Sequence, residues 1–504
     1  MQYRIRQSSS LIPLLPVQVA IAGGSLLLVA ALWTGALQSR SVFFMTTILI
    51  MVSVTVGIAN WIKLTSSYFD AFLIVALSQI AFNASQFIMY GVGLLNGDDL
   101  FAQRYSISSF KEDYIAQAAA LVLGSLSMYM LGGCLAIGAS ASRGTLPHSH
   151  SSRTLGDRGL ELKFMRGFGN LCFWVGLVPY LLFKGKLVLL SIRSGYLSIY
   201  EQNPVYQDPA SALSFLFEPG LVILLAHAAY TRNDVRRKGL FAIGLFIVAF
   251  TILCGRRGGG YMLLCALLLV RHRLWRALKA REIMLALLAA VVLLAFVGQI
   301  RTADDRSEAV RTSARKGAIS LLKSGLDEMG SSASTIIGTL YLVPSDREFE
   351  YGMAYGSALL TIVPNVFASG KHPFAERCQL GGWLTWKLAP AIYEAGGGLG
   401  FSNIAESYLN FGPFGYLIFL PYGFILATLV RRIRETGSPR LVMAEAIMVM
   451  FLPVWARASL INIARPIFVL VVFPLVAMAI LKALRRRRLY QCIATPSPRP
   501  ARQT

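Results

Sequence analysis

The stretch LIPLLPVQVAIAGGSLLLVAALWTGAL, residues 11–37, decides the fold class, because it carries no charged side chain over a length that crosses a lipid bilayer. A transmembrane helix needs about 20 mostly apolar residues. The stretch is too long for the apolar core of a signal peptide, and no small-residue cleavage pattern follows it closely. We therefore expect an uncleaved first transmembrane helix.

Similar apolar runs recur along the rest of the chain. They lie at residues 42–62, 68–95, 114–139, 167–183, 212–230, 240–254, 261–270, 283–300, 408–430, 441–456 and 466–484. Of the 504 residues 55% are hydrophobic and 14% are charged, whereas soluble domains have about 25% charged residues. A soluble protein could not bury so much apolar surface. The sequence predicts an all-α, polytopic membrane protein of about 12 transmembrane helices.

The formal charge of +23 orients the chain in the membrane. Its basic excess falls on the side of both termini, in the connections 143–166, 232–238, 271–281, 431–440 and 485–488. Cytoplasmic loops carry such an excess of Lys and Arg, so we expect both termini in the cytoplasm. Because membrane topology explains the basic residues, a nucleic-acid partner is not expected.

One connection is much longer than the others and lies on the opposite, outer side. We expect four parts in the chain: helices 1–9 within residues 1–300, this long loop at 301–407, helices 10–12 within 408–488, and a disordered tail at 489–504. Loops of this length are often functional. We expect helical stretches near 314–329 and re-entrant segments near 354–366, followed by a Gly-, Pro- and aromatic-rich half suited to lining a cavity.

Several kinds of enzyme site are absent from the sequence. It contains no GxxxxGK[ST] loop, no GxGxxG motif after a strand, no HExxH and no GxSxG, which argues against an ATP-driven pump, a metalloprotease and a serine hydrolase. The six cysteines form neither a CxxC nor a Cys/His metal spacing. We expect packing cysteines, no metal site and no cofactor.

Arginines at the outer boundaries are the first candidate site residues. Guanidinium groups form bidentate, charge-assisted bonds to phosphate oxygens and keep their charge. The turn 255–260, GRRGGG, places two of them at the membrane edge, where an unpaired charge is costly. The alternative interpretation is that each arginine reaches lipid headgroups or pairs with a carboxylate. The expected diphosphate-binding residues are Arg193, Arg256, Arg257, Arg301, Arg377, Arg457 and Arg465.

A transfer to a sugar hydroxyl also needs a proton acceptor. Glu406, just before the tenth run, and His372, in the long loop, are the two candidates that we favour. Glu376 and Glu394 are further possibilities, and each of these residues alone is more often solvated or a helix cap. Partial burial of Glu406 would raise the pKa of its carboxyl toward neutral pH.

The third run contains three amide side chains on one helix face. Gln79, Asn83 and Gln86 are spaced four and three residues apart. We favour hydrogen bonding between helices for them, with a polar cavity wall as the alternative. Asp70 and Glu218 are intramembrane carboxylates that should pair with a buried cation or line water.

The arrangement resembles the bacterial O-antigen and exopolysaccharide repeat-unit polymerases, the Wzy-type glycosyltransferases. The likeness is carried by Arg193-Ser194-Gly195-Tyr196 after the fifth run and by Gly255-Arg256-Arg257-Gly258. It is also carried by the long outer loop that ends in Gly-rich sequence, and by the residues from Phe401-Ser402 through Glu406 to Asn410-Phe411-Gly412.

This resemblance implies a GT-C-like fold in the bacterial inner membrane. The enzyme would move the growing glycan from undecaprenyl diphosphate to the distal sugar hydroxyl of a lipid-linked repeat unit at the periplasmic face, without a cofactor. The expected partners are the undecaprenyl-diphosphate-linked oligosaccharide, membrane lipid and a chain-length regulator (a polysaccharide co-polymerase). Glycan contacts are expected from Tyr196, Tyr200, Asn403 and Asn410.

Two other functions stay open at this point. An O-antigen ligase would use the same donor with a lipid A-core acceptor, so its loss leaves no repeat unit on the core, whereas loss of a polymerase leaves one. A flippase or transporter of lipid-linked glycan commonly shows two homologous halves with sites at the membrane midplane. The chain has no such halves and a single asymmetric outer loop, which disfavours transport.

Overall fold

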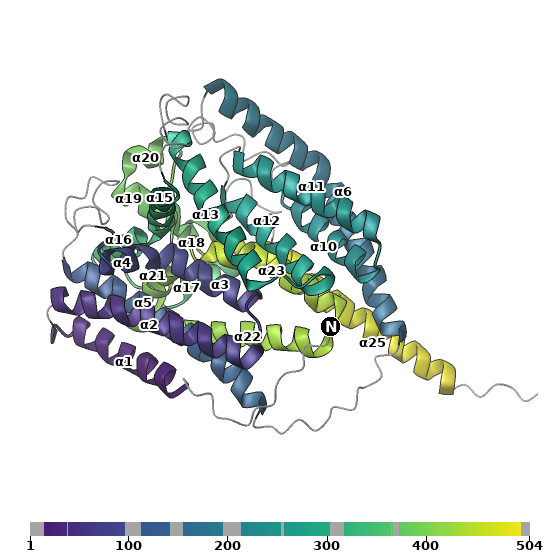
Figure 1. Cartoon of the computed structure of the whole chain (residues 1–504), viewed down its shortest axis with the longest axis horizontal. Coiled ribbons are helices and arrows are strands. Elements are labelled where there is room, and N and C mark those ends of the chain that lie inside the picture. The colour runs from purple at the N-terminus through teal and green to yellow at the C-terminus, as the bar shows by residue number, and fades with distance from the viewer. Residues whose placement is uncertain are drawn as a thin grey trace, which may run out of the picture.

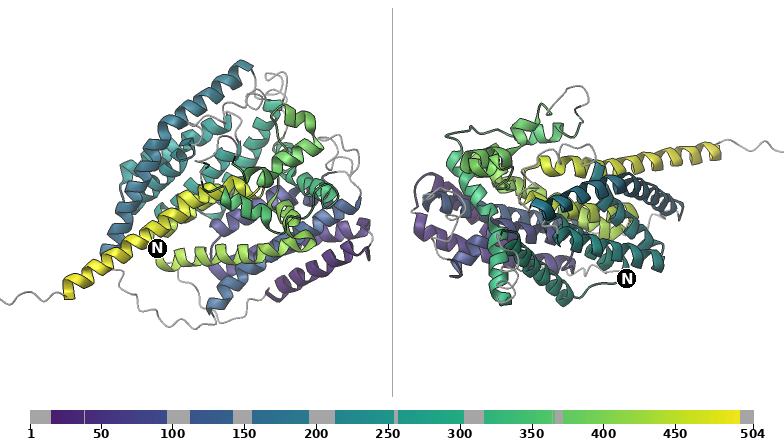
Figure 2. Two further views of the ribbon diagram at one scale, coloured as in Figure 1. Left: turned by 180° about the vertical axis from the view of Figure 1, so that it is seen from behind. Right: turned by 90° about the horizontal axis from the view of Figure 1, so that it is seen from above.

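A computed structural model describes residues 15–37, 39–95, 112–141, 155–194, 213–253, 257–302, 317–363, 365 and 372–494. Every regular element within these ranges is a helix, so the expected α-helical membrane fold is confirmed. Figure 1 shows the helices as one bundle, with α6 along one edge and α25 extending beyond the body. Figure 2 shows the same projection of α25 from behind and from above.

The first group of helices packs around α5 (Glu112–Ala141), which contacts α1 (Leu15–Trp33), α2 (Ser39–Thr65) and α22 (Phe419–Thr436). Two glycines bring α5 and α22 together. A Cβ atom at Gly132 would overlap the backbone of Leu420, and one at Gly423 would overlap the backbone of Tyr129. Small residues allow this close backbone approach, which is how membrane helices gain packing contacts in lipid.

A bulged helix crosses next to this group. It consists of α3 (Ala71–Gln79), the π-helical turn η1 (Ile80–Ala84) and α4 (Ser85–Gly91). The π turn inserts an extra residue into the helix, and such bulges are frequent at functional sites. It changes the direction in which the side chains of Phe82 and Asn83 point relative to a regular helix. These two side chains contact Arg457 and Ser402.

A second group of helices lies on the other side of the bundle. Its members are α6 (Leu155–Ser194), α10 (Phe217–Tyr230), α11 (Asp234–Leu253), α12 (Arg257–Val270), η3 (Arg271–Trp275) and α13 (Ala280–Thr302). Helix α10 packs against α6 and α11, and α12 packs against α11 and α23. The long connection after α13 contributes short helices: α15 (Ala318–Gly330), α16 (Ser332–Leu342), α17 (Met353–Leu360), α18 (Ala375–Cys378), α19 (Leu380–Leu388) and α20 (Pro390–Glu394).

The last part of the chain returns to the bundle. Its elements are α21 (Asn403–Phe411), the 3-10 turn η4 (Gly412–Ile418), α22, α23 (Pro439–Trp455), α24 (Ile461–Ile467), η5 (Phe468–Val472) and α25 (Phe473–Ala494). Helix α25 therefore continues past residue 488, where we expected the tail to begin, and residues 495–504 lie outside the described ranges.

Seven helical segments of the described chain are long and apolar enough to cross a membrane. They are Leu15–Trp33, Val42–Thr65, Ala71–Gly91, Asp113–Gly138, Asp157–Leu190, Asn403–Thr436 and Ile461–Arg487. The expected count of about 12 is not supported by helix length and composition. Each of the other predicted runs does form a helix, but α10 and α12 have 14 residues and α23 has 17, which is short for a bilayer.

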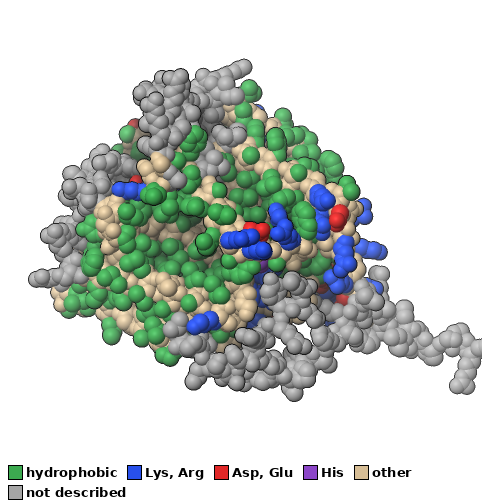
Figure 3. All heavy atoms as spheres, in the orientation of Figure 1, with side chains coloured by type: hydrophobic (Ala, Val, Ile, Leu, Met, Phe, Trp, Pro, Cys, Tyr) green, Lys and Arg blue, Asp and Glu red, His purple; other side chains and the backbone are tan. Residues whose placement is uncertain are grey.

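One end of the bundle is held together by buried ion pairs, and we call it the basic end. Arg434 Nη2 lies 2.8 Å from Asp70 Oδ2, and Arg273 Nη2 lies 2.8 Å from Glu445 Oε1, with both carboxylates fully buried. The expected pairing of Asp70 with a buried cation is therefore confirmed. In Figure 3, Lys and Arg side chains gather toward the right of the visible face, and hydrophobic side chains cover much of the rest.

Two of the three amides of the third run, Asn83 and Gln86, bond to other helical segments, as we favoured, whereas Gln79 bonds to Asn83 in its own helix. Asn83 Nδ2 donates to Gln79 Oε1 (2.8 Å), and Asn83 Oδ1 accepts a bond from Ser402 Oγ (2.9 Å). Gln86 Nε2 donates to Asp327 Oδ1 on α15 (2.8 Å). Glu218, the other expected intramembrane carboxylate, accepts a bond from Tyr180 Oη (2.9 Å).

Candidate functional site

The candidate site is organised around a break between α23 and α24, residues 456–460, which we call the α23–α24 break. Helix α23 ends at Trp455 and α24 begins at Ile461. Pro453 lies in the last turn of α23, and a proline there leaves one backbone carbonyl without its helical donor. The chain therefore leaves the helix at this point and presents Arg457 on a short loop.

Arg457 is held from its backbone and lies over an aromatic ring. The N–H of Phe401 donates to the carbonyl of Arg457 (3.3 Å), and Gly400 packs against the same residue. The guanidinium carbon lies 5.9 Å from the centre of the Phe82 ring, within the range of a cation–π contact. Phe82 belongs to η1, so the π turn places an aromatic surface beneath the arginine.

Glu406 lies directly beside the break and is completely buried. Its Oε2 accepts a bond from Trp455 Nε1 (2.8 Å), and the backbone N–H of Leu460 lies 3.0 Å from Oε1 and 2.9 Å from Oε2. Ser402 caps the helix that carries Glu406 by accepting the Ile404 N–H, because a hydroxyl at this position satisfies a free helical donor. The carboxylate thus contacts the residues at both ends of the break.

Arg465 and His372 each bond to a backbone carbonyl just after the end of α17. Arg465 Nη2 donates to the carbonyl of Thr361 (2.6 Å), and His372 Nε2 lies 3.1 Å from the carbonyl of Val363. The His372 Nδ1 accepts the N–H of Phe374 (3.3 Å), which assigns the proton to Nε2 in this arrangement. His372 is partly exposed, whereas Glu406 is not.

Arg377 joins the same neighbourhood through α18. The Ser459 hydroxyl, on the break, donates to the carbonyl of Cys378 (3.3 Å). Arg377 Nε lies 3.0 Å from Glu350 Oε2, and the Arg377 side chain is 47% exposed. Burial raises the pKa of the Cys378 thiol to about 11, so this cysteine stays protonated and packs as a small apolar side chain.

Arg347, which we did not predict from the sequence, lies between the same groups. Its Nη2 lies 2.8 Å from Glu350 Oε1 and 2.9 Å from the carbonyl of Arg377, and its guanidinium is 5.0 Å from the Trp383 ring centre. In the sequence it stands within SDREFE, which has the composition of a solvated charged turn. Its contact with Trp383 distinguishes it from such a turn, and this contact exists only in the tertiary structure.

Helix α12 also approaches the break, through Met262. Phe82, Met262, Met329 and Ala456 form one buried cluster, and Ala456 directly precedes Arg457. Met262 lies one to two turns from Arg257, the first residue of α12. The N-terminal half of the helix that begins with Arg257 therefore packs against the residue before Arg457, and the side chain of Arg257 is outside what the structure describes.

For most of the remaining expected residues the structure describes only the backbone or nothing. Arg193 and Arg301 lie at the last turns of α6 and α13, with only their backbones described, and Arg256, Tyr196 and Tyr200 lie outside the described residues. Asn403 and Asn410 are fully buried in α21. Asn410 Nδ2 donates to the carbonyl of Glu406 (2.8 Å), and both polar atoms of Asn403 lack a hydrogen-bond partner.

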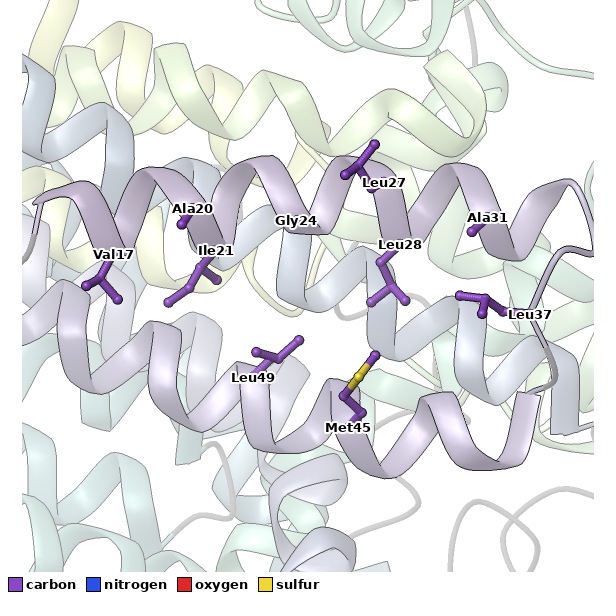
Figure 4. Close-up of a pocket in the computed structure, with 10 residues that line it drawn as sticks. All are labelled: Val17, Ala20, Ile21, Gly24, Leu27, Leu28, Ala31, Leu37, Met45 and Leu49. Carbon is purple, nitrogen blue, oxygen red and sulfur yellow. The ribbon is translucent and has the colours of Figure 1, made fainter.

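Two other features of the described residues bear on binding. No group of three His, Cys, Asp or Glu side chains stands close enough to hold a metal ion in this part of the chain. A groove of about 610 Å³ lies between α1 and α2 (Figure 4), lined by apolar side chains such as Val17, Leu28 and Leu49. The described residues that line the groove include no cationic side chain to bind a phosphate, so we do not assign the chemistry to it.

Comparison with models of protein families gives a match over most of the chain. A family model described as O-antigen polysaccharide polymerase Wzy matches residues 22–487, which is nearly the whole chain and includes every segment of the site. No curated protein and no solved structure matches the chain significantly.

Proposed function

Because the chain belongs to the O-antigen polysaccharide polymerase Wzy family, we propose that it extends a glycan held on undecaprenyl diphosphate by transferring it to a lipid-linked repeat unit. The family supports a membrane enzyme of O-antigen polymerisation, and the donor and acceptor are our proposal. We further propose that the reaction takes place at the periplasmic face of the inner membrane.

The observation that carries the proposal is that contacts connect the segments that hold four expected residues, two from near residue 375 and two from near residue 460. His372, Arg377, Arg457 and Arg465 are joined through the α23–α24 break, α18 and the end of α17. Three of them are guanidinium groups, which suit the oxygens of a diphosphate. The ring of Phe82 makes a cation–π contact with one of these groups, the guanidinium of Arg457.

We propose the following transfer step. The bond between the anomeric carbon of the growing glycan and the diphosphate oxygen breaks, and a bond forms from that carbon to the acceptor hydroxyl oxygen. The hydroxyl proton passes to a base, and undecaprenyl diphosphate leaves with the bonding electron pair. The guanidinium groups of Arg377, Arg457 and Arg465 stabilise the negative charge that develops on the leaving group.

We assign the base to His372 rather than to Glu406. A base must come within hydrogen-bond reach of the proton that it accepts, and His372 is partly exposed in the loop region. Glu406 has no exposed surface, and its two oxygens already accept bonds from Trp455 and Leu460. His372 would exchange the Phe374 N–H at its unprotonated Nδ1 for the substrate hydroxyl.

We also propose the topology that this function needs. All 12 predicted runs would cross the membrane or reach into it, with both termini in the cytoplasm and the basic end on the cytoplasmic side. Arg193, Arg256, Arg257 and Arg301 would then lie on the periplasmic side with the break. A GT-C-like architecture, glycan contacts from Tyr196, Tyr200, Asn403 and Asn410, and binding of a chain-length regulator stay predictions.

The test uses the purified full-length protein in lipid nanodiscs with a synthetic undecaprenyl-diphosphate repeat unit. A ladder of longer lipid-linked glycans is the expected product. Arg457→Ala should lose the ladder, whereas Arg281→Ala, an exposed arginine in the first turn of α13, should keep it. Transfer only to a lipid A-core acceptor would instead identify a ligase, and an absence of any transfer by the unaltered protein would refute the proposal.

A further inference from the structure

The geometry of the break assigns a different role to Glu406. Trp455 is the last residue of α23 and Leu460 directly precedes α24, and the same carboxylate accepts hydrogen bonds from both. The Glu406 side chain thereby links the two ends of the five-residue segment between these helices, which includes Arg457. A chain break of this kind would otherwise be free to change the position of Arg457.

A second set of contacts holds the loop from the same segment of chain. Phe401, five residues before Glu406, donates its N–H to the carbonyl of Arg457. Ser402 caps α21 and donates to Asn83 on η1, next to the Phe82 ring on which the Arg457 guanidinium rests. The start of α21 therefore fixes both the loop that carries Arg457 and the aromatic surface beneath it.

We propose that Glu406 is a positioning residue, which holds Arg457 in the orientation needed to bind the diphosphate of the lipid-linked substrate. This inference rests on the proposed function, because it takes Arg457 as a diphosphate contact. A carboxylate suits this role because both of its oxygens only accept, matching the two N–H donors that face it. A glutamine would present an NH₂ group to one of these donors and lose that bond.

The experiment measures binding rather than turnover. The full-length protein in nanodiscs is titrated with undecaprenyl diphosphate, comparing the unaltered chain with Arg457→Ala, Glu406→Gln and the double variant. A hydrogen bond to a charged group is worth about 1.5–3 kcal/mol, so we expect each single variant to weaken binding by about 10- to 100-fold. The double variant should bind about as weakly as Arg457→Ala alone, because Glu406 acts through that arginine.

A milder variant and a matched control guard against simple misfolding. Trp455→Phe removes the indole N–H and keeps a smaller aromatic ring in its place, and it should weaken binding by about 3- to 10-fold, with no further effect when Glu406 is already glutamine. The matched control is Glu218→Gln. It alters another carboxylate, which accepts a hydrogen bond from the hydroxyl of Tyr180, and it should leave diphosphate binding unchanged.

The outcomes separate this inference from the proposed function. Additive losses in the double variant, or normal diphosphate binding by Glu406→Gln, would overturn the positioning role. If turnover is measurable, Glu406→Gln should keep the acid limb of the pH–rate profile, and loss of that limb would identify Glu406 as the base instead. If the protein binds the diphosphate with the expected coupling but makes no polymer, the proposed function fails and the positioning role stands.

Discussion

The basic end and the α23–α24 break both concentrate arginines, but they hold them in different ways. At the basic end, Arg434 and Arg273 lie 2.8 Å from the buried carboxylates Asp70 and Glu445. At the break, the contacts that we describe for Arg457 and Arg465 are with an aromatic ring and a backbone carbonyl. These contacts orient the two guanidinium groups, whereas Arg377, next to the break, is paired with the carboxylate of Glu350.

We infer from this difference in partners that the arginines of the basic end stabilise the fold, and we propose that those of the break act in substrate binding. A buried carboxylate that neutralises a guanidinium makes both groups costly to remove, because the remaining charge would be left in an apolar environment. A ring or a carbonyl orients a guanidinium without neutralising it. The two ends therefore give opposite predictions for the same type of substitution.

The largest effect is expected at the break. Arg457→Ala should reduce the rate of glycan extension by about 100- to 1000-fold, the loss typical of removing one preorganised donor to a developing charge. The amount of inserted protein should be unchanged, as measured by immunoblotting of membranes beside a polymer ladder assay. A normal ladder at the normal rate would remove Arg457 from the site.

The opposite pattern is expected at the basic end. Asp70→Ala would leave Arg434 buried without its carboxylate and remove the N-cap of α3. We expect a loss of about 3–5 kcal/mol in the free energy of unfolding, measured by thermal unfolding in detergent. The activity of each remaining folded molecule should be close to normal, and a stable but inactive variant would contradict the comparison.

The proposed base should have an intermediate effect. His372→Gln should slow extension by about 100-fold, at the low end of what general base catalysis contributes, while diphosphate binding stays unchanged. Measuring both quantities on one preparation separates proton transfer from binding. Equal losses in binding and rate would make His372 a binding residue instead.

The smallest effect concerns the rings beneath the arginines. Phe82→Leu should slow extension by about 3-fold, because a cation–π contact contributes about 0.5–1 kcal/mol. The matched control is Phe241→Leu at the basic end, where Phe241 lies 5.6 Å from the Arg271 guanidinium. This control should leave the rate unchanged, and an equal effect of both substitutions would show that the Phe82 contact has no special role.

Many residues of the candidate site could be predicted from the sequence, but which of them lie close together could not. The chemistry of arginine and the boundary positions of Arg377, Arg457 and Arg465 were enough to select them. Arg347 was missed because its neighbours Asp346, Glu348 and Glu350 suggest a solvated turn. Glu406 was selected for its position before an apolar run, but its role depends on Trp455 and Leu460, about 50 residues later in the chain.

The sequence by itself determined that the chain is a helical membrane protein, because long uncharged stretches have no other stable environment. It also indicated the family, through residues whose order along the chain is visible without a structure. Only the tertiary structure decided how long each helix is and which arginines are neutralised. Those properties depend on contacts between residues far apart in sequence, such as Arg434 with Asp70 and Ser459 with Cys378, and no local pattern encodes them.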